Sequence, residues 1–269
     1  MKRCRLIFQF VIIVAAAVTG FRFAMGWSRT SIEAYCPFGG LEAGLSLITE
    51  RQFTCATGER NLALFLALVL LTLLARKAFC GWVCPVGAIS EWFAALGRKV
   101  FQRTRWDDRL APLHALEPPR RVDRIMRWLR LPVLIIILYF TFKTGELIFR
   151  GYDPYYILFS FHGHEVRMWS YAILGVILLG VILFPMAWCR YLCPLGAALW
   201  PFSAVGRLRL VRHEETCTHC RACDHACPQA IVVSGTREVR SGECTLCFDC
   251  TEVCPEDKTL VLEVRGLGR

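Results

Sequence analysis

The sequence predicts an all-α membrane domain of four transmembrane helices, followed by a small, cysteine-rich α+β domain. Three observations support this fold class. Hydrophobic residues make up 55% of the 269 residues and the mean hydropathy is +0.42, which is too apolar for an ordinary soluble domain. Four apolar segments follow one another along the chain. The C-terminal tail then holds more than half of the fifteen cysteines in two regular groups. We therefore expect a membrane domain over 1–206 and a second domain over 207–269.

Each of the four apolar segments is about as long as a bilayer crossing requires, roughly 20 residues. The first follows Lys2, Arg3 and Arg5, as the apolar part of a signal peptide does. Its apolar character continues through Phe23 and no clean cleavage site follows, so we interpret it as a span. The four predicted spans are residues 6–25, 60–79, 130–149 and 168–188.

Positive charge in the loops predicts the orientation. The loop 76–130 carries twelve Lys or Arg residues, whereas 26–60 carries three and 150–168 carries two. Basic loops stay in the cytoplasm, so 76–130 and both termini are expected there, in the inner membrane of a bacterium. This loop contributes a net +7 to the net charge of +10, which in a soluble protein would have suggested nucleic acid as a partner. We expect no nucleic-acid binding.

Two cysteine runs in the tail share one spacing, C-x2-C-x2-C-x3-C-P. Residues 217–228 are CTHCRACDHACP and residues 244–255 are CTLCFDCTEVCP. This is the bacterial two-cluster ferredoxin pattern, in which the fourth cysteine of each run binds the cluster of the other run. Zinc usually takes a single set of four ligands, and disulfides are rare in the cytoplasm. The predicted ligands of two [4Fe-4S] clusters are Cys217, Cys220, Cys223 and Cys254 for the first, and Cys244, Cys247, Cys250 and Cys227 for the second.

Short strands are expected after each run, at AIVV (230–233) and TLVLEV (259–264), in two βαβ-like halves. The segment 214–258 has nine acidic and four basic residues, a net charge of −5. The loop 76–130 has twelve basic and five acidic residues, a net charge of +7. These opposite charges suggest that the tail domain rests on that loop. The alternative is an acidic surface offered to a soluble partner.

A second cysteine motif occurs twice, as CGWVCPVGA (80–88) and CRYLCPLGA (189–197). Each copy follows an even-numbered predicted span, so the membrane domain is expected to consist of two pseudo-repeated hairpins. If each stretch stays helical, its two thiols lie on one face, and proline ends the helix and frees backbone N–H groups. Together the copies offer Cys80, Cys84, Cys189 and Cys193 as ligands of a third cluster. A redox-active dithiol, a docking element for the tail domain and a zinc site are the alternatives.

With these motifs in place, the sequence resembles the NapH/MauN-type membrane polyferredoxins, which are related to the C-terminal part of NosR and to CcoG-like proteins. The resemblance covers nearly the whole chain. It implies a quinol dehydrogenase component that takes electrons from membrane quinol and passes them through iron–sulfur clusters to another redox protein, such as a ferredoxin-type protein or a reductase subunit. The segment YCPFGGLE (35–42) lies outside the family's core pattern.

Two other functions stay open at this point. One is a CcoG-like assembly factor that reduces a metal such as copper, or a thiol, during oxidase maturation. The other is a sensor of the quinone pool. The chain has no C-x-x-C-H, G-x-G-x-x-G, P-loop or H-E-x-x-H motif, so c-type haem, nucleotide cofactors and metalloprotease chemistry have no support. The resemblance implies membrane lipid and the quinone pool as the non-protein partners.

The loops predicted to be exported hold the weaker candidates. Cys36 and Cys55 are expected to form a disulfide, with a reactive thiol pair as the alternative, and Cys4 is expected to be a lone thiol. Quinol oxidation needs a proton acceptor near the membrane surface. Lys143 and Glu146, one turn apart, are more simply explained as an ion pair. The candidate proton acceptors are His162, His164, Glu33 and Asp153.

Overall fold

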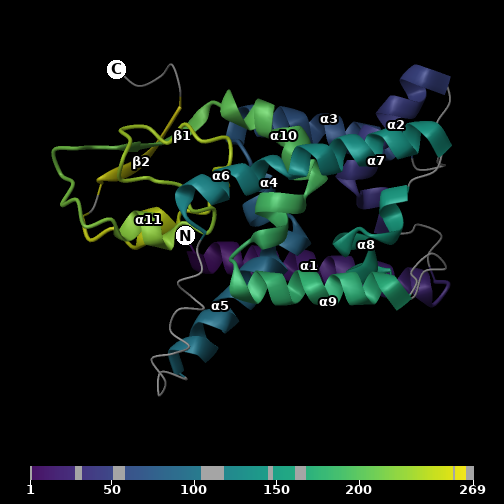
Figure 1. Ribbon diagram of the computed structural model, residues 1–269, viewed down its shortest axis with the longest axis horizontal. Coiled ribbons are helices and arrows are strands. Elements are labelled where there is room, and N and C mark those ends of the chain that lie inside the picture. The colour runs from purple at the N-terminus through teal and green to yellow at the C-terminus, as the bar shows by residue number, and fades with distance from the viewer. Residues whose placement is uncertain are drawn as a thin grey trace. The chain divides into compact units, whose positions relative to one another are not determined.

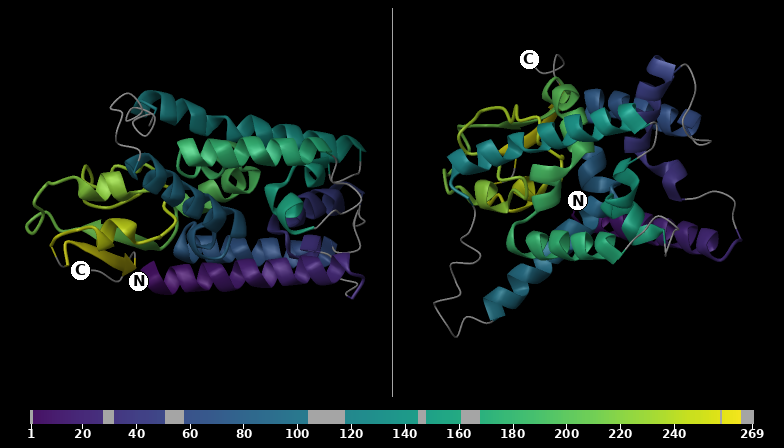
Figure 2. Two further views of the ribbon diagram at one scale, coloured as in Figure 1. Left: turned by 90° about the horizontal axis from the view of Figure 1, so that it is seen from below. Right: turned by 45° about the vertical axis from the view of Figure 1, so that its right-hand side comes forward.

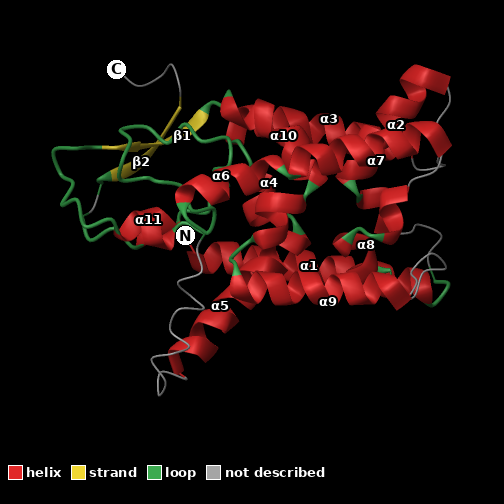
Figure 3. Ribbon diagram, viewed as in Figure 1, coloured by secondary structure: helices red, strands yellow, loops and turns green. Residues whose placement is uncertain are grey.

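The computed structural model describes residues 2–27, 32–50, 58–103, 118–144, 148–160, 168–256 and 258–264. Helices make up most of these residues, and the named strands are a single pair, β1 and β2 (Figures 1 and 3). The chain divides into two compact units. The tail unit comprises residues 1–11, 68–88 and 199–269, and the helical unit comprises residues 12–67 and 89–198.

Three helices among the described residues are long and apolar enough to cross a membrane. Two of them, α1 (Lys2–Ala24) and α3 (Gly58–Ala75), match the first two predicted spans. The third, Arg121–Thr144, combines α6 (Arg120–Trp128) with α7 (Arg130–Thr144) and therefore begins earlier than the predicted 130–149. The protein is thus membrane-associated by the length and composition of its helices.

The fourth predicted span, 168–188, is shorter in the structure. Helix α9 (Met168–Leu183) has 16 residues, fewer than the roughly 20 that a crossing requires. It ends two residues before Pro185, which lacks the N–H that a continuing helix would use. Met186 then takes a positive φ of 58°, which no regular helix accommodates. The predicted count of four spans is therefore not confirmed.

Proline begins several of the remaining helices, because its missing N–H costs nothing at the first helical position. Pro37, Pro85, Pro154 and Pro194 each stand there. The remaining helical elements are η1 (Ile32–Tyr35), α2 (Pro37–Glu50), α4 (Ala78–Trp82), α5 (Pro85–Arg103), η3 (Ile148–Gly151), α8 (Pro154–Phe159), η4 (Trp188–Leu192, a π-helix), α10 (Pro194–Ala204), α11 (Ala222–Ala226) and α12 (Asp249–Glu252).

Close backbone contact holds α2 against α3 within the helical unit. A Cβ atom at Gly40 would lie 2.0 Å from the carbonyl oxygen of Asn61, so only glycine fits there. On α2, Glu42 accepts a hydrogen bond of 2.8 Å from the Thr141 hydroxyl of α7, and both side chains are buried. A buried carboxylate needs such a donor, which ties the two helices together.

The tail unit contains a two-stranded antiparallel sheet. Strand β1 (Leu208–Arg212) pairs with β2 (Leu260–Val264), with Leu208 opposite Val264. The strand expected at TLVLEV is confirmed, but its partner is a segment for which no strand was expected. The core beside the sheet consists of Leu210, Val233, Val239, Cys244, Leu246 and Cys250.

The strand expected at AIVV (230–233) is wrong, and so are the two βαβ-like halves. The carboxylate of Asp224 accepts hydrogen bonds from the backbone N–H groups of Val233 and Ser234, at 2.7 and 2.8 Å. It also accepts from the Ser234 hydroxyl at 2.6 Å. A side chain thus takes the donors that a sheet would have used, so this segment remains a loop.

Candidate functional site

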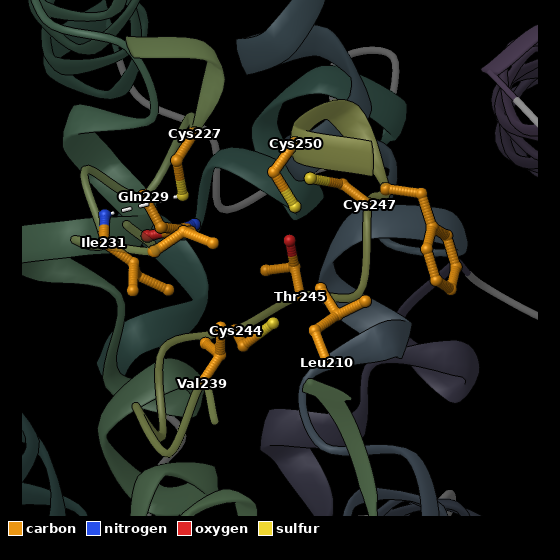
Figure 4. Close-up of a pocket in the computed structure, with 11 residues that line it drawn as sticks. Leu210, Cys227, Gln229, Ile231, Val239, Cys244, Thr245, Cys247 and Cys250 are labelled. Carbon is orange, nitrogen blue, oxygen red and sulfur yellow. Dashed lines mark hydrogen bonds between the residues drawn. The ribbon is translucent and has the colours of Figure 1, made fainter. Parts of the chain in front are cut away.

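Four cysteines of the tail unit line one cavity (Figure 4). The sulfur atoms of Cys227, Cys244, Cys247 and Cys250 point into the same space. Much of the remaining lining is apolar, and the backbone N–H of Ile231 donates to Cys227 Sγ at 3.5 Å. We call this the second cavity, because three of its four cysteines belong to the second run. It is a pocket of thiols within a largely apolar wall. The other lining residues are Leu210, Gln229, Ile231, Val233, Val239, Thr245 and Phe248.

The other four cysteines of the two runs line a first cavity of nearly equal size. The empty space is about 360 Å³ here and about 340 Å³ in the second cavity, including space open to solvent. The first cavity has a more polar wall. It is lined by Cys217, Cys220, Cys223 and Cys254, with Arg212, Thr218, His219, Arg221, Ser234, Thr259 and Leu260.

These two sets of four have the composition expected from the sequence, with Cys227 and Cys254 exchanged between the runs. The thiols surround a space instead of converging on a point. Among the described residues, no group of three or more His, Cys, Asp or Glu side chains is placed to hold a single metal ion. An arrangement of this kind suits a cluster of several metal atoms, with one thiolate at each corner.

Each run bends around its cavity through two residues in the left-handed region. His219 and Arg221 have φ of 55° and 59°, and Leu246 and Phe248, at the equivalent places, have 48° and 62°. Non-glycine residues rarely adopt such values, and they concentrate at functional sites. The matching angles show that the two runs share one local backbone conformation.

Burial sets the ionisation of the thiols. It raises the pKa of Cys227 to about 12 and that of Cys247 to about 11, and it also raises the pKa of Cys244 and of Cys250. By contrast, the backbone N–H of Ala222 lowers the pKa of the exposed Cys220. Thiolates, not thiols, bind metals, so metal binding in the second cavity must release protons.

The two C-x3-C-P motifs share one pattern of backbone hydrogen bonds, each within its own unit. The N–H of Cys84 donates to Phe79 O and that of Cys193 to Trp188 O, both at 2.9 Å and both five residues back. An i to i−5 bond is the π-helical pattern, which often marks functional sites. The condition that each stretch stays helical is met only in part, because α4 ends at Trp82 and η4 ends at Leu192, before the second cysteine of each motif.

A glycine three residues after each second cysteine lets the next helix approach the motif. A Cβ atom at Gly87 would lie 2.3 Å from the carbonyl oxygen of Cys80. At Gly196 the equivalent distance to Cys189 O is 3.5 Å, an ordinary contact. The N–H of Gly196 also lies 3.4 Å from Cys193 Sγ, so a backbone donor is directed at this sulfur. The first copy is thus packed more tightly than the second.

Residues at the end of α3 and in α4 hold the second run. The ammonium group of Lys77 pairs with Glu243 at 2.7 Å, and the indole N–H of Trp82 donates to Leu246 O at 2.9 Å. Arg76 donates to Leu208 O and to Ser241 O, both at 2.8 Å. The tail therefore rests on the first residues of the basic loop, as its charge suggested.

The start of α1 also contacts this unit. The guanidinium of Arg5, which is fully buried, lies 3.0 Å from Asp249 Oδ1 on α12. In Figures 1 and 2 the N-terminal end of α1 (purple) is the end of this helix that lies nearer to the tail segment (yellow). Gln9, one helical turn further along α1, donates to Gly81 O at 2.9 Å. Polar residues in an apolar helix thus have buried partners.

Asp153 is the candidate proton acceptor whose side chain the structure describes. It caps α8 by accepting from the Tyr155 N–H at 3.0 Å, and Cys36 Sγ lies 3.6 Å from its other oxygen. Burial raises the pKa of Asp153 to about 6. Cys36 is a free thiol, and its expected disulfide partner lies outside the described residues. The other proposed residues, His162, His164, Cys55, Glu146 and the side chain of Glu33, also fall outside the described part.

Sequence reasoning missed one buried ionic site, at Asp123 on α6. Its carboxylate pairs with Arg190, which lies inside the second C-x3-C-P motif, and with Arg127 at 2.8 Å. The hydroxyl of Tyr191 donates to it at 2.7 Å. The available signal was the single carboxylate in the basic stretch RRVDRIMR.

Comparison with protein families identifies two domains. A 4Fe-4S binding domain matches residues 57–104 and 166–210, which include both C-x3-C-P motifs. A 4Fe-4S dicluster domain matches residues 209–255, which include both ferredoxin runs. No solved structure gives a significant match to the chain.

Several curated proteins are similar to the chain over most of its length. YccM of Escherichia coli, a protein named for electron transport, is 31% identical over 84% of this chain and 64% of its own length. An uncharacterized protein of Methanocaldococcus jannaschii is 31% identical over 73% of this chain and 76% of its own. The ferredoxin-type protein NapH of Haemophilus influenzae is 29% identical over 68% and 61%. The chain thus spans less than two thirds of YccM and of NapH.

The cysteine cavities, the apolar helices and these matches define an iron–sulfur protein associated with a membrane. Within that class, the chain belongs to the NapH/MauN-type polyferredoxins.

Proposed function

We propose that this protein is the electron-transfer component of a quinol dehydrogenase, passing electrons between the membrane quinone pool and another redox protein. One observation carries the proposal. Two cavities, each lined by four cysteines, lie in the same compact unit as the end of the apolar helix α3. A protein with this arrangement can accept electrons at a membrane and deliver them to a partner in water.

Each cavity is proposed to hold one [4Fe-4S] cluster, which accepts and releases one electron at a time. The eight cysteines of the two runs would be the ligands. The apolar wall of the second cavity keeps water away, and the N–H of Ile231 donates to Cys227 Sγ. Hydrogen bonds to sulfur and solvent exposure both tune the reduction potential of such a site.

A third cluster held by Cys80, Cys84, Cys189 and Cys193 is part of the proposal. The match of both motifs to a 4Fe-4S binding domain supports it, and so does the shared backbone pattern of the two copies. The topology proposed with it has four spans in two pseudo-repeated hairpins, both termini in the cytoplasm and insertion in the inner membrane of a bacterium. The charge of loop 76–130 supports this orientation.

Counting iron tests the cluster assignment. The protein is purified anaerobically in detergent, and iron and acid-labile sulfide are measured per chain, with EPR spectra after dithionite reduction. We expect about twelve irons, and about eight after all four C-x3-C-P cysteines are changed to alanine. Cys4→Ala, which removes an exposed cysteine outside every motif, is the control and should change nothing. About eight irons in both proteins would remove the third cluster from the proposal.

Quinol chemistry needs a separate measurement. Oxidised protein in lipid nanodiscs is mixed anaerobically with a reduced short-chain ubiquinol or menaquinol, and cluster bleaching is followed in a stopped-flow instrument. Rapid bleaching that depends on quinol concentration is expected. If neither quinol reduces clusters that dithionite does reduce, the protein is not a quinol dehydrogenase component.

A further inference from the structure

The two ferredoxin runs have the same spacing and backbone conformation, but they differ in exposure. In the second run, residues 244–246 are buried and residues 247 and 248 are partly buried. We call residues 244–248 the covered loop. At the equivalent places in the first run, Thr218, His219, Cys220 and Arg221 are all exposed. We call residues 217–221 the exposed loop.

Specific contacts cover the second run. The indole of Trp82 packs edge-on against the ring of Phe248, with centroids 6.3 Å apart, and its N–H bonds to Leu246 O. A Cβ atom at Gly81 would lie 2.9 Å from Thr245 O, so the backbones approach as closely as glycine allows. The N–H of Lys77 bonds to Cys244 O at 3.3 Å. Residues 77–82 therefore seal this loop from water.

Side-chain chemistry follows the same division. The covered loop has Leu246 and Phe248 where the exposed loop has His219 and Arg221, and the backbone angles are matched. Apolar side chains suit a surface that is permanently buried against helix α4. Polar side chains suit a surface that is wet part of the time, such as a transient interface.

Exposed charge beside the first cavity indicates the kind of partner. Two acidic residues, Glu214 and Glu215, precede Cys217, while Glu252 and Glu256 flank Cys254. Among the described residues there, Arg221 and Lys258 are the exposed cations, and the buried Arg212 pairs with Glu214 at 3.0 Å. Thiolate-bound clusters add further negative charge. A protein with a basic face would be drawn to this surface, most strongly at low ionic strength.

The geometry points to the exposed loop as the port through which this protein exchanges electrons with a soluble one-electron carrier that has a basic face, while the covered loop faces the membrane-side donor. This inference rests on the proposed function. Each exchange moves one electron and no proton. A [4Fe-4S] cluster held by Cys217, Cys220, Cys223 and Cys254 would supply the electron, and the metal centre of the carrier, a haem or an iron–sulfur centre, would accept it.

Electron transfer slows steeply with distance, so the two cavities have different roles. A carrier that docks on the exposed loop comes close to the first cavity and stays farther from the second. Residues 77–82 occupy the equivalent approach to the second cavity. Electrons from the membrane side thus pass through the second cavity before they reach the first.

Horse-heart ferricytochrome c, a basic one-electron carrier, is the probe. Full-length protein is reduced with dithionite, desalted anaerobically and mixed with the probe at several salt concentrations. We expect the Glu215→Gln/Glu252→Gln variant to react several-fold more slowly at low salt, and the difference to vanish at high salt. Glu59→Gln, an exposed carboxylate of the helical unit, is the matched control and should react like the parent. Equal rates in all three proteins would overturn the basic partner.

Two equivalent cysteines test the order of the sites. Cys220→Ala should slow oxidation by cytochrome c by roughly tenfold or more and spare quinol reduction of the second cavity. In the Cys247→Ala variant, quinol should no longer reduce the protein. Cytochrome c should still oxidise the dithionite-reduced variant rapidly. EPR spectra verify in each variant that the other site is intact. If Cys220→Ala is oxidised as fast as the parent, the port is wrong, even where quinol reduction shows the proposed function to be right.

Discussion

Lys77 and Glu243 form an ion pair of 2.7 Å in which both side chains are almost fully buried, with exposures of 4% and 7%. Removing one partner of such a pair leaves an uncompensated charge out of water. We expect Lys77→Met to lower the free energy of unfolding by about 3–5 kcal/mol. Limited proteolysis and thermal unfolding of the detergent-solubilised protein would measure the change.

A second pair supplies the control for that prediction. Arg240 lies 2.9 Å from Glu238, but its side chain is 78% exposed. Arg240→Met should cost no more than about 1 kcal/mol. The double variant Lys77→Met/Glu243→Leu should recover much of the loss, because no buried charge is then left alone. A single variant as stable as the parent would contradict the role given to this pair.

The two glycines that follow the C-x3-C-P motifs should respond differently to the same substitution. In Gly87→Ala the new Cβ atom would lie 2.3 Å from Cys80 O, a backbone atom, so α5 must move. We expect a loss of about 1–3 kcal/mol and a lower iron content. Gly196→Ala, with 3.5 Å at the same place, should be tolerated. Thermal unfolding and iron analysis compare the variants, and equal effects would rule out this packing difference.

Asp123 should stabilise the second motif through its pair with Arg190. Asp123→Asn keeps the shape but removes the charge, so the buried guanidinium loses its partner. A loss of about 3–5 kcal/mol is expected. Tyr191→Phe, which removes one neutral donor to the same carboxylate, should cost only about 1 kcal/mol. Chemical denaturation tests this order, and a reversal would show that Tyr191 is the main partner.

Asp153 predicts a pH dependence of stability. Burial raises its pKa to about 6, from an ordinary value of 3.8. Between these values the folded protein keeps a proton that the unfolded chain releases, so the free energy of unfolding falls as pH rises through this window. Asp153→Asn removes the titration and keeps an oxygen for the Tyr155 N–H. Relative to that of the parent, the free energy of unfolding of the variant should rise between pH 4 and pH 7, by at most about 3 kcal/mol. Thermal unfolding at several pH values measures this difference, and a constant difference would contradict the burial of this carboxyl group.

The cysteine sets could be predicted because their spacing is a local property of the sequence. The helices α1 and α3 were predictable for a similar reason, since length and apolar composition are sufficient. Strand β1 was not, because its pairing with β2 joins segments about fifty residues apart. The loop at 230–233 depends on a single carboxylate, Asp224, which takes backbone donors that β-propensity assigns to a sheet.

The C-x3-C-P motifs show where periodicity fails. Four-residue spacing would place both thiols on one face of a regular helix, but the N–H of each second cysteine donates to the carbonyl oxygen five residues back. Ionic sites such as Asp123 with Arg190 are equally hard to predict. Both residues look like surface charges in a basic protein until the fold buries them together.

The unequal covering of the two ferredoxin runs also bears on how this tail can evolve. Phe248 packs against Trp82 of the same chain and Leu246 is buried in the core of the tail unit, so substitutions at both positions are restricted by residues of this chain. His219 and Arg221 are exposed and do not pack against Trp82, so they can change together with the surface of a partner protein. Of the two copies of the motif, the exposed loop is the less restricted by contacts with residues 77–82. Lineages with different redox partners should therefore differ first at positions 218, 219 and 221.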